Sequence, residues 1–573
     1  MKTAGETRGN GVVAVLIHDE SPEAAAVLEQ AVLSAFRFQG IPFRILSLER
    51  GVPDGFFRTE AARLAAVLFP QPGSMGRLSP SSVSEMLQAV QEGLGLLAYE
   101  PRVQELPGAV LKLFRVDPTS VSNSAFRTVS TLRNDHYLTW TRPVGEVVRS
   151  DKPVPYSILP KSSTDLVGSE SGHPLLLCGE AGKGRTILFP FDVRLFTLEH
   201  LGHACGLDDV FQKSVLWTAR KPFLTYSMPH FATMAIDDSS GSYNHFRYVD
   251  ALSAHGWKPN LGLFTDTIDE VAHETADLDS KKLRELDREG RADVGFHALR
   301  YNESFCFDHL GQRPLTGKEL DERFARWDHY ERKWGFKASP WIHPHFGEIS
   351  LAAMPYFKAR GAEFVTHFLP FDAAWFEVPE KKPPLDPQPP FGHNGYFQFN
   401  PSASPDFLAV NCVLEKKTRE SPDFVVKADY LWGNTVFWDE APRTRIPQIA
   451  QTISEQARRG IDSGFYGQTL THEQRIACLK PEEWEEIWKE ADKLLSRYTL
   501  EHRRHSEILP YVKRRRQCAL TSVEVDAADR SVRYAFDSDM AVGTRVQLHR
   551  NADRDGVESA QHEIRSRSGK VTE

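Results

Sequence analysis

Cysteine is sparse in this chain of 573 residues, and its six cysteines are scattered over positions 178, 205, 306, 412, 478 and 518. No two of them form a Cys-x-x-Cys pair, which argues against both a cysteine zinc site and a disulfide framework. Long apolar runs are also lacking. The run VVAVLIH at residues 12–18 is typical of a buried strand and is far too short to span a bilayer, so we expect no membrane span.

An excess of positive charge and a secretion signal are lacking as well. The formal net charge is −8, whereas nucleic acid favours a basic surface, so we expect no nucleic-acid partner. The first residues, MKTAGETRGNG, lead directly into the strand without the apolar region and cleavage site of a signal peptide. The sequence as given predicts a cytoplasmic protein, or an exported one if an upstream segment is missing.

The length of the chain predicts two or three α/β domains. In residues 1–225, apolar strands alternate with helical stretches, which favours a doubly wound parallel sheet. The expected strands are 12–17, 43–48, 65–69 and 94–98, and the expected helices are 24–36 and 82–90. The residues Asp19-Glu20-Ser21-Pro22 before the first helix are a helix-start signal, with proline near the first turn. Residues 175–192 predict a hairpin around the turn Gly182-Lys183-Gly184.

Residues 226–505 repeat strand and helix in the rhythm of a (β/α) barrel. The expected strands are 232–236, 259–264, 293–296, 338–342 and 363–366. Proline-rich and aromatic residues 368–430 interrupt this rhythm, and we expect them to form an insertion over the mouth of the barrel. Residues 506–573 predict a small β appendage, and its polar end, residues 551–573, predicts disorder.

Candidate reactive side chains follow the ends of the expected strands, where the active sites of such barrels lie. They are Asp237, Asp238, His297, His343, His345 and His472. Carboxylates and imidazoles are typical ligands of a catalytic divalent metal. Two consecutive aspartates at a strand end point in different directions, so that one can bind a metal while the other accepts a proton from water.

Four segments resemble, in order, the motifs of the NodB-homology polysaccharide deacetylases. They are MAIDDSSGSY (234–243), LRELDREGRADVGFHALRY (283–301), SPWIHPHFGEIS (339–350) and SGFYGQTLTHEQ (463–474). The resemblance covers residues 226–500 and implies a (β/α) barrel enzyme. That enzyme would remove N-acetyl groups from the amino sugars of a polysaccharide, such as a microbial exopolysaccharide.

The resemblance also implies a role for each matched residue. Asp237 would be the general base and His472 the general acid. Asp238 and His297 would bind a divalent metal, in the first place zinc, with cobalt or nickel as alternatives.

The chain departs from the family pattern at the third ligand. The family usually has a histidine four residues after the first one, and Tyr301 stands there. We prefer His345 as the replacement ligand, with Tyr301 and His343 as alternatives. Asp439, which follows Trp438, is the best match for the aspartate-tryptophan segment of the family and would help to tune His472.

The first domain resembles the class I glutamine-amidotransferase-like domains that accompany carbohydrate-active enzymes. The resemblance rests on GLGLLAYE (93–100) and GKGRTILFPFD (182–192). A glutaminase would have a cysteine nucleophile on the elbow after the fourth strand, where this chain has Tyr99-Glu100-Pro101. We therefore expect a non-catalytic domain that acts as a scaffold or senses a ligand.

Two other functions compete with the deacetylase interpretation. Tyr301 in place of a histidine favours a catalytically inactive carbohydrate-binding protein on the same barrel. A glycosidase would use Asp237 or Asp238 with a second carboxylate, for which Asp439 or Glu348 could serve.

Overall fold

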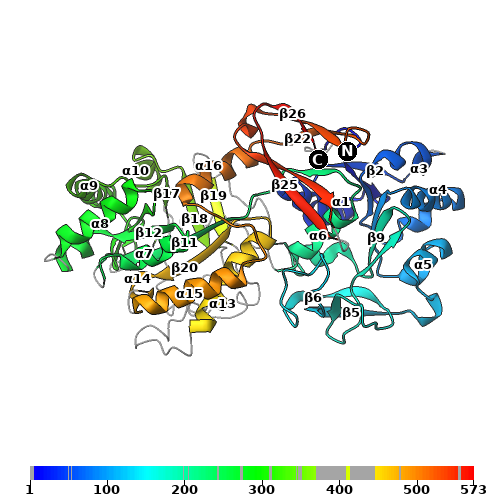
Figure 1. The fold of residues 1–573 in the computed structure, drawn as a ribbon, viewed down its shortest axis with the longest axis horizontal. Helices are drawn as coiled ribbons and strands as arrows, with labels where there is room; N and C mark the ends of the chain where they lie inside the picture. The colour runs from blue at the N-terminus through cyan, green and yellow to red at the C-terminus, as the bar shows by residue number, and fades with distance from the viewer. Residues whose placement is uncertain are drawn as a thin grey trace. The chain divides into compact units, whose positions relative to one another are not determined.

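The computed structural model divides the chain into two compact units (Figure 1). The first contains Met1–Met228 and Arg514–Glu573, and the second lies within Pro229–Lys513. The structure describes residues 6–49, 51–52, 55–197, 199–203, 206–241, 244–271, 275–308, 313–342, 345, 352–368, 408–412, 446–476, 479–552 and 556–572. Among the helices in these ranges, none combines the length and the apolar character of a membrane span.

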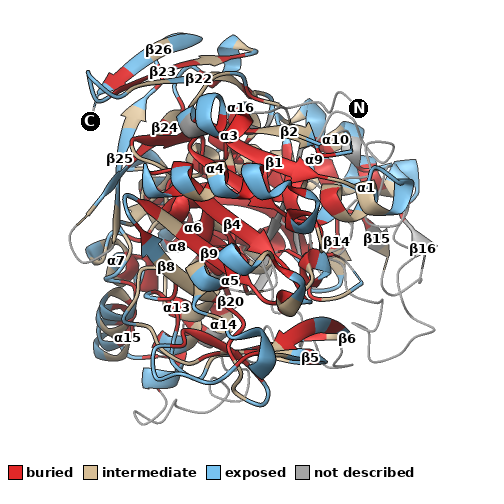
Figure 2. Ribbon diagram, turned by 90° about the vertical axis from the view of Figure 1, so that its right-hand side faces the viewer, coloured by how far each residue is buried: buried red, intermediate tan, exposed pale blue. Residues whose placement is uncertain are grey.

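A six-stranded sheet forms the centre of the first unit, in the order β2-β1-β3-β4-β9-β8. The strands are β1 (Val13–Ile17), β2 (Phe43–Ser47), β3 (Ala66–Phe69), β4 (Gly95–Tyr99), β8 (Leu177–Ala181) and β9 (Gly184–Phe189). All pairs are parallel except the β8–β9 hairpin, in which Gly182 has a φ of 62°. Every residue of β1, β3 and β4 is buried, as in a parallel sheet covered on both faces (Figure 2).

Helices cover this sheet, both in the regions 24–36 and 82–90 that the sequence indicated and at two further positions. They are α1 (Pro22–Leu28), α2 (Ser34–Gln39), α4 (Pro80–Gln91), α5 (Gly108–Phe114) and α6 (Asp208–Thr218). Ser21 caps α1, with Pro22 in its first turn, which is the start signal expected at this point. At the elbow after β4, the buried carboxylate of Glu100 accepts hydrogen bonds from the N–H groups of Gly73 and Arg102.

The C-terminal residues add strands to the first unit, and the expected disorder of residues 551–573 is wrong for most of them. β22 (Leu520–Asp526), β23 (Ser531–Phe536) and β26 (Ser568–Thr572) form one antiparallel sheet. β10 (Phe223–Thr225), β24 (Arg545–Asn551) and β25 (Val557–Glu563) form another. Ladder hydrogen bonds order these polar strands, although their side chains are largely exposed.

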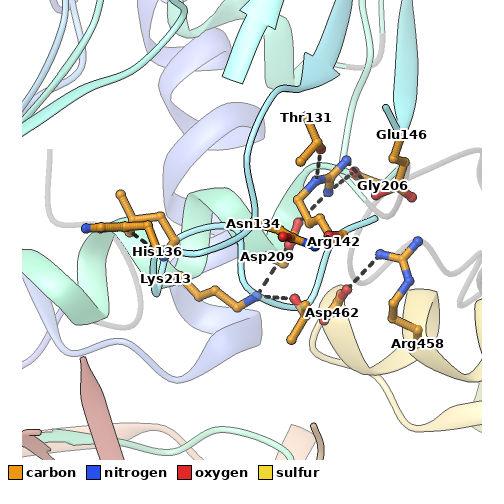
Figure 3. Close-up of polar contacts among 12 residues, drawn as sticks. Thr131, Asn134, His136, Arg142, Glu146, Gly206, Asp209, Lys213, Arg458 and Asp462 are labelled. Carbon is orange, nitrogen blue, oxygen red and sulfur yellow. Dashed lines mark hydrogen bonds and ion pairs between the residues drawn. The ribbon is translucent and has the colours of Figure 1, made fainter. Parts of the chain in front are cut away.

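A buried arginine holds the connection between β5 (Ser122–Thr131) and β6 (Val147–Ile158) of the first unit (Figure 3). Arg142 is 1% exposed, and it pairs with Asp209 of α6 at 2.8 Å and with Glu146 at 3.0 Å. Its Nε donates to Thr131 Oγ1, and its Nη1 donates to the carbonyl of Gly206. The guanidinium thereby connects a strand end, a loop and a helix.

The second unit contains seven consecutive parallel strands in the order β19-β18-β17-β13-β12-β11-β20. They are β11 (Phe231–Ser239), β12 (Pro259–Phe264), β13 (Asp293–Arg300), β17 (Trp341–Ile342), β18 (Phe364–Phe368), β19 (Leu408–Cys412) and β20 (Gly467–His472). Within the described residues no ladder joins β19 to β20, so the described strands of the expected (β/α) barrel form an open sheet. β19 also belongs to the sheet, although residues 368–430 were expected to form only a loop; the rest of that insertion lies outside the described residues, apart from the end of β18.

Helices between these strands complete the repeating pattern. They include α7 (Arg247–Ala254), α8 (Ala276–Arg288), α9 (Gly317–Trp334), α10 (Met354–Ala359), α13 (Ile446–Asp462), α14 (Glu473–Ile476) and α15 (Pro481–Leu494). The core beneath them is rich in aromatic side chains, among them Trp257, Phe324 and Trp488, which are all fully buried. Since these strands are parallel, their carboxyl ends meet at one edge of the sheet.

Candidate metal centre

The candidate site lies at the carboxyl end of β11, between β12 and β20. Every residue of β11 is buried, so its polar side chains must find partners inside the protein. The ladder between β11 and β12 shifts register between Ile236 and Ser239, and Asp238 has a φ of 54°. This irregularity falls on the two consecutive aspartates, Asp237 and Asp238.

Three side chains from distant parts of the chain meet at this strand end. His297 lies on β13, and His345 follows β17. His297 Nε2 lies 3.1 Å from Asp238 Oδ1 and 3.0 Å from His345 Nδ1, and His345 Nδ1 lies 3.5 Å from Asp238 Oδ1. Within the described residues, no other group of three or more His, Cys, Asp and Glu side chains is placed to hold a metal ion.

This cluster fits a divalent metal in both chemistry and spacing. Two imidazole nitrogens and one carboxylate oxygen form a ligand set that catalytic zinc uses with its fourth position open. Ligand atoms about 2.0–2.1 Å from a tetrahedral ion lie about 3.3–3.4 Å from one another. The three separations here, 3.0 to 3.5 Å, are close to that value.

A hydrogen bond to the main chain sets the tautomer of His345. Its Nε2 lies 2.9 Å from the backbone carbonyl of Tyr301. A carbonyl can only accept, so Nε2 carries the proton and Nδ1 of the neutral ring directs its lone pair toward the cluster. Burial lowers the pKa of His345 to about 3, although the charge of Asp238 acts to raise it. The low pKa keeps the ring neutral.

Asp238 is held as a carboxylate although it is buried. Burial acts to raise its pKa, but the electrostatic interactions with the imidazoles of the site, that with His472 being the largest, and the hydrogen bond with His297 together bring the pKa below its ordinary value. Its Oδ1 faces the two histidine ligands, and its Oδ2 accepts a hydrogen bond from Gln474 Nε2 at 3.2 Å. The two carboxylate oxygens of Asp238 therefore have fixed directions, one toward the histidines and one toward Gln474.

Asp237 and His472 are neighbours across the β11–β20 ladder, in which they are register partners. Asp237 is buried and His472 is half-buried. On β12, a Cβ at Gly262 would lie only 3.2 Å from Asp237 Oδ1 and 3.0 Å from His297 Cγ, so the absent side chain leaves room for both residues. The Phe264 ring, with its centroid 5.1 Å from that of His345, forms an apolar wall.

The structure brings together five of the residues that the sequence indicated, namely Asp237, Asp238, His297, His345 and His472. Tyr301 contacts the cluster through its carbonyl, while its side chain is 58% exposed. His343, Asp439 and Glu348 lie outside the described residues.

Sequence reasoning overlooked Glu473, Gln474 and Gly262. Glu473 and Gln474 directly follow the expected acid His472, a position that could have drawn attention to them. Gly262 had no local signal, because its role depends on side chains of two other strands.

The same fold occurs in a solved structure. No protein-family model matches this chain, and no curated protein matches its sequence. The structure described as "Agd3 a novel carbohydrate deacetylase" matches 99% of this chain and 98% of its own, with a TM-score of 0.54 and 10% identity. The comparison establishes the fold.

Two further structures match part of the chain at lower scores. A family 4 carbohydrate esterase from Streptomyces lividans matches 48% of this chain and 91% of its own, with a TM-score of 0.26 and 12% identity. A family 4 pseudoenzyme from Bacillus anthracis matches 50% of this chain and 68% of its own, with a TM-score of 0.26 and 11% identity. At these TM-scores, neither match carries an argument.

Proposed function

We propose that this protein is a metal-dependent hydrolase that removes N-acetyl groups from the amino sugars of a polysaccharide. The observation that carries the proposal is the meeting of Asp238, His297 and His345 beside Asp237 and His472. A metal-binding set next to a carboxylate and an imidazole provides the Lewis acid, general base and general acid of metal-assisted amide hydrolysis. Similarity of fold to a structure titled as a carbohydrate deacetylase supports the carbohydrate substrate.

The residues of the chain divide the reaction between them. Asp238, His297 and His345 would hold the divalent metal, which supplies polarisation of the acetamide carbonyl when bound. Asp237 accepts a proton from the water whose oxygen attacks the carbonyl carbon. His472 donates a proton to the sugar nitrogen as the carbon–nitrogen bond breaks, so acetate and a free amine result.

Elemental analysis of the purified protein tests the metal site. We expect close to one equivalent of zinc, cobalt or nickel in the parent and little in Asp238→Asn or His297→Ala, each of which removes a ligand. His329→Ala is the matched control, since His329 is an exposed histidine on α9 and its loss leaves the cluster intact.

Acetate release from partly acetylated amino-sugar oligomers tests the reaction. Asp237→Asn and His472→Ala are expected to keep the metal and to lose about 10²- to 10⁴-fold in rate, the usual contribution of a general base or acid. A parent that binds no metal after soaking with zinc would contradict the proposal and favour a carbohydrate-binding protein. Cleavage of the sugar chain that survives chelation would instead favour a glycosidase.

A further inference from the structure

Two side chains after His472 contact the strand end that carries the aspartates. Glu473 and Gln474 begin α14, directly after β20. Glu473 is fully buried, and Gln474 is half-buried with its Nε2 on Asp238. One short segment thus supplies the proposed acid and two contacts to the neighbouring strand.

Glu473 binds the main chain of the turn that follows the aspartates. Its carboxylate accepts from Ser240 N at 2.5 Å, from Gly241 N at 2.9 Å and from Ser240 Oγ at 3.0 Å. It also accepts from the hydroxyl of Tyr248 on α7 at 2.8 Å. Both N–H groups lie inside the protein, where a donor without an acceptor would be costly.

The conformation of this turn explains why it needs the hydrogen bonds of Glu473. Asp238 has a φ of 54°, in the left-handed region that residues other than glycine adopt at a cost of roughly 1–2 kcal/mol. A strained residue keeps its conformation only where the surroundings determine it strongly. The four hydrogen bonds of Glu473 hold the residues that follow Asp238, starting with Ser240 two residues later. They thereby fix the backbone next to the strained residue.

Gln474 acts on the side chain of the same residue. It donates to Asp238 Oδ2, while Oδ1 faces His297 and His345. The carboxylate is therefore oriented to present one oxygen to the cluster. Hydrogen bonds of this kind to metal-binding side chains contribute substantially to metal affinity.

We propose that Glu473 and Gln474 are positioning residues of the metal centre, Glu473 through the backbone of the Asp238 turn and Gln474 through the Asp238 carboxylate. This inference rests on the proposed function, because it assigns Asp238 to a metal. It adds contacts from the segment after His472, which reach the turn after Asp238 through Glu473 and the Asp238 carboxylate through Gln474.

Zinc affinity, measured by competition with a chromogenic chelator, tests the inference. Gln474→Met keeps the length of the side chain and removes its donor, and we expect zinc to bind about 10- to 100-fold more weakly. Glu473→Gln places a donor against Ser240 N and Gly241 N, and we expect a loss at least as large. The visible spectrum of the cobalt-loaded protein should change in both variants, because the ligand geometry changes.

Gln451→Met on α13 is the matched control, since Gln451 is exposed and donates only to Glu455 among the described contacts. Its zinc affinity and cobalt spectrum should equal those of the parent. If Gln474→Met also binds zinc and cobalt as the parent does, the inference is overturned and the proposed function stands. If the parent itself binds neither metal, both are overturned.

Discussion

At His345, the ligand atom comes from the side chain, whereas the ring is oriented by a main-chain group of another residue, Tyr301. The imidazole supplies Nδ1, and the carbonyl of Tyr301 holds Nε2. Tyr301 stands where the family that the sequence resembles has a histidine, and in this chain its backbone carbonyl lies 2.9 Å from His345 Nε2. The phenol itself is exposed.

This division of roles predicts that Tyr301→Phe keeps the metal. The substitution removes the hydroxyl and leaves the carbonyl in place, so zinc content and affinity should stay within about twofold of the parent, because the hydrogen bond between this carbonyl and His345 Nε2 is retained. His345→Phe should bind little zinc. Elemental analysis of the parent, Tyr301→Phe and His345→Phe measures the zinc that each protein retains. Loss of zinc from Tyr301→Phe would assign the phenol as a ligand.

At the scale of elements, the buried charged side chain of Arg142 connects the loop between β5 and β6 to helix α6. Residues 132–146 pass between β5 and β6 without forming a strand, and Arg142 is one of the residues that connect them to α6. Thr141, which contacts Lys213, and His136, which packs on Trp217, are two others. A buried ion pair adds little net stability compared with apolar side chains, but removing one partner leaves the other charge buried. Arg142 has two such partners, Asp209 and Glu146.

Arg142→Met should therefore destabilise the first unit by about 3–5 kcal/mol, because two buried carboxylates lose their main counter-charge. Urea unfolding followed by circular dichroism measures the change. Arg102→Met is the control: its pair with Glu105 is half exposed, and its loss should cost less than about 1 kcal/mol. Equal effects of the two substitutions would show that the buried network does not stabilise this unit.

At the scale of the whole molecule, the two ends of the chain fold together. Thr7 Oγ1 donates to the carbonyl of Leu520, and Gly11 N donates to that of Val523. Leu224 and Tyr226 pack into a core formed mainly by the C-terminal strands. The residues expected to be an appendage are thus part of the first unit.

A chain that ends at residue 513 should have a less stable first unit. Leu224 and Tyr226 would become exposed, and burial of such side chains contributes about 1.5–3 kcal/mol each. Calorimetry should show its melting transition lowered by on the order of 10 °C or more. In the full chain, Leu548→Ala should cost about 2–5 kcal/mol and the exposed Met540→Ala much less. A truncated chain that melts like the parent would contradict this account.

Much of the fold was predictable from local patterns. Continuous apolar runs identified β1, β3 and β4, and the capping signal at Ser21-Pro22 identified the start of α1. Only the last two strands, β25 and β26, were mistaken for disorder, because their side chains are polar and main-chain ladders rather than apolar burial order them. β19 was missed because it lies within a segment rich in proline.

The sequence alone determined which chemistry is available: two aspartates and several histidines at the ends of successive strands, in the order of a known motif series. Only the tertiary structure decided which of them meet. His345 joins the cluster because β17 lies beside β13, and the Tyr301 carbonyl orients its ring. Gly262, Glu473 and Gln474 act across strands on partners between 25 and 236 residues away. Such contacts depend on sheet order and register, which local sequence patterns do not encode.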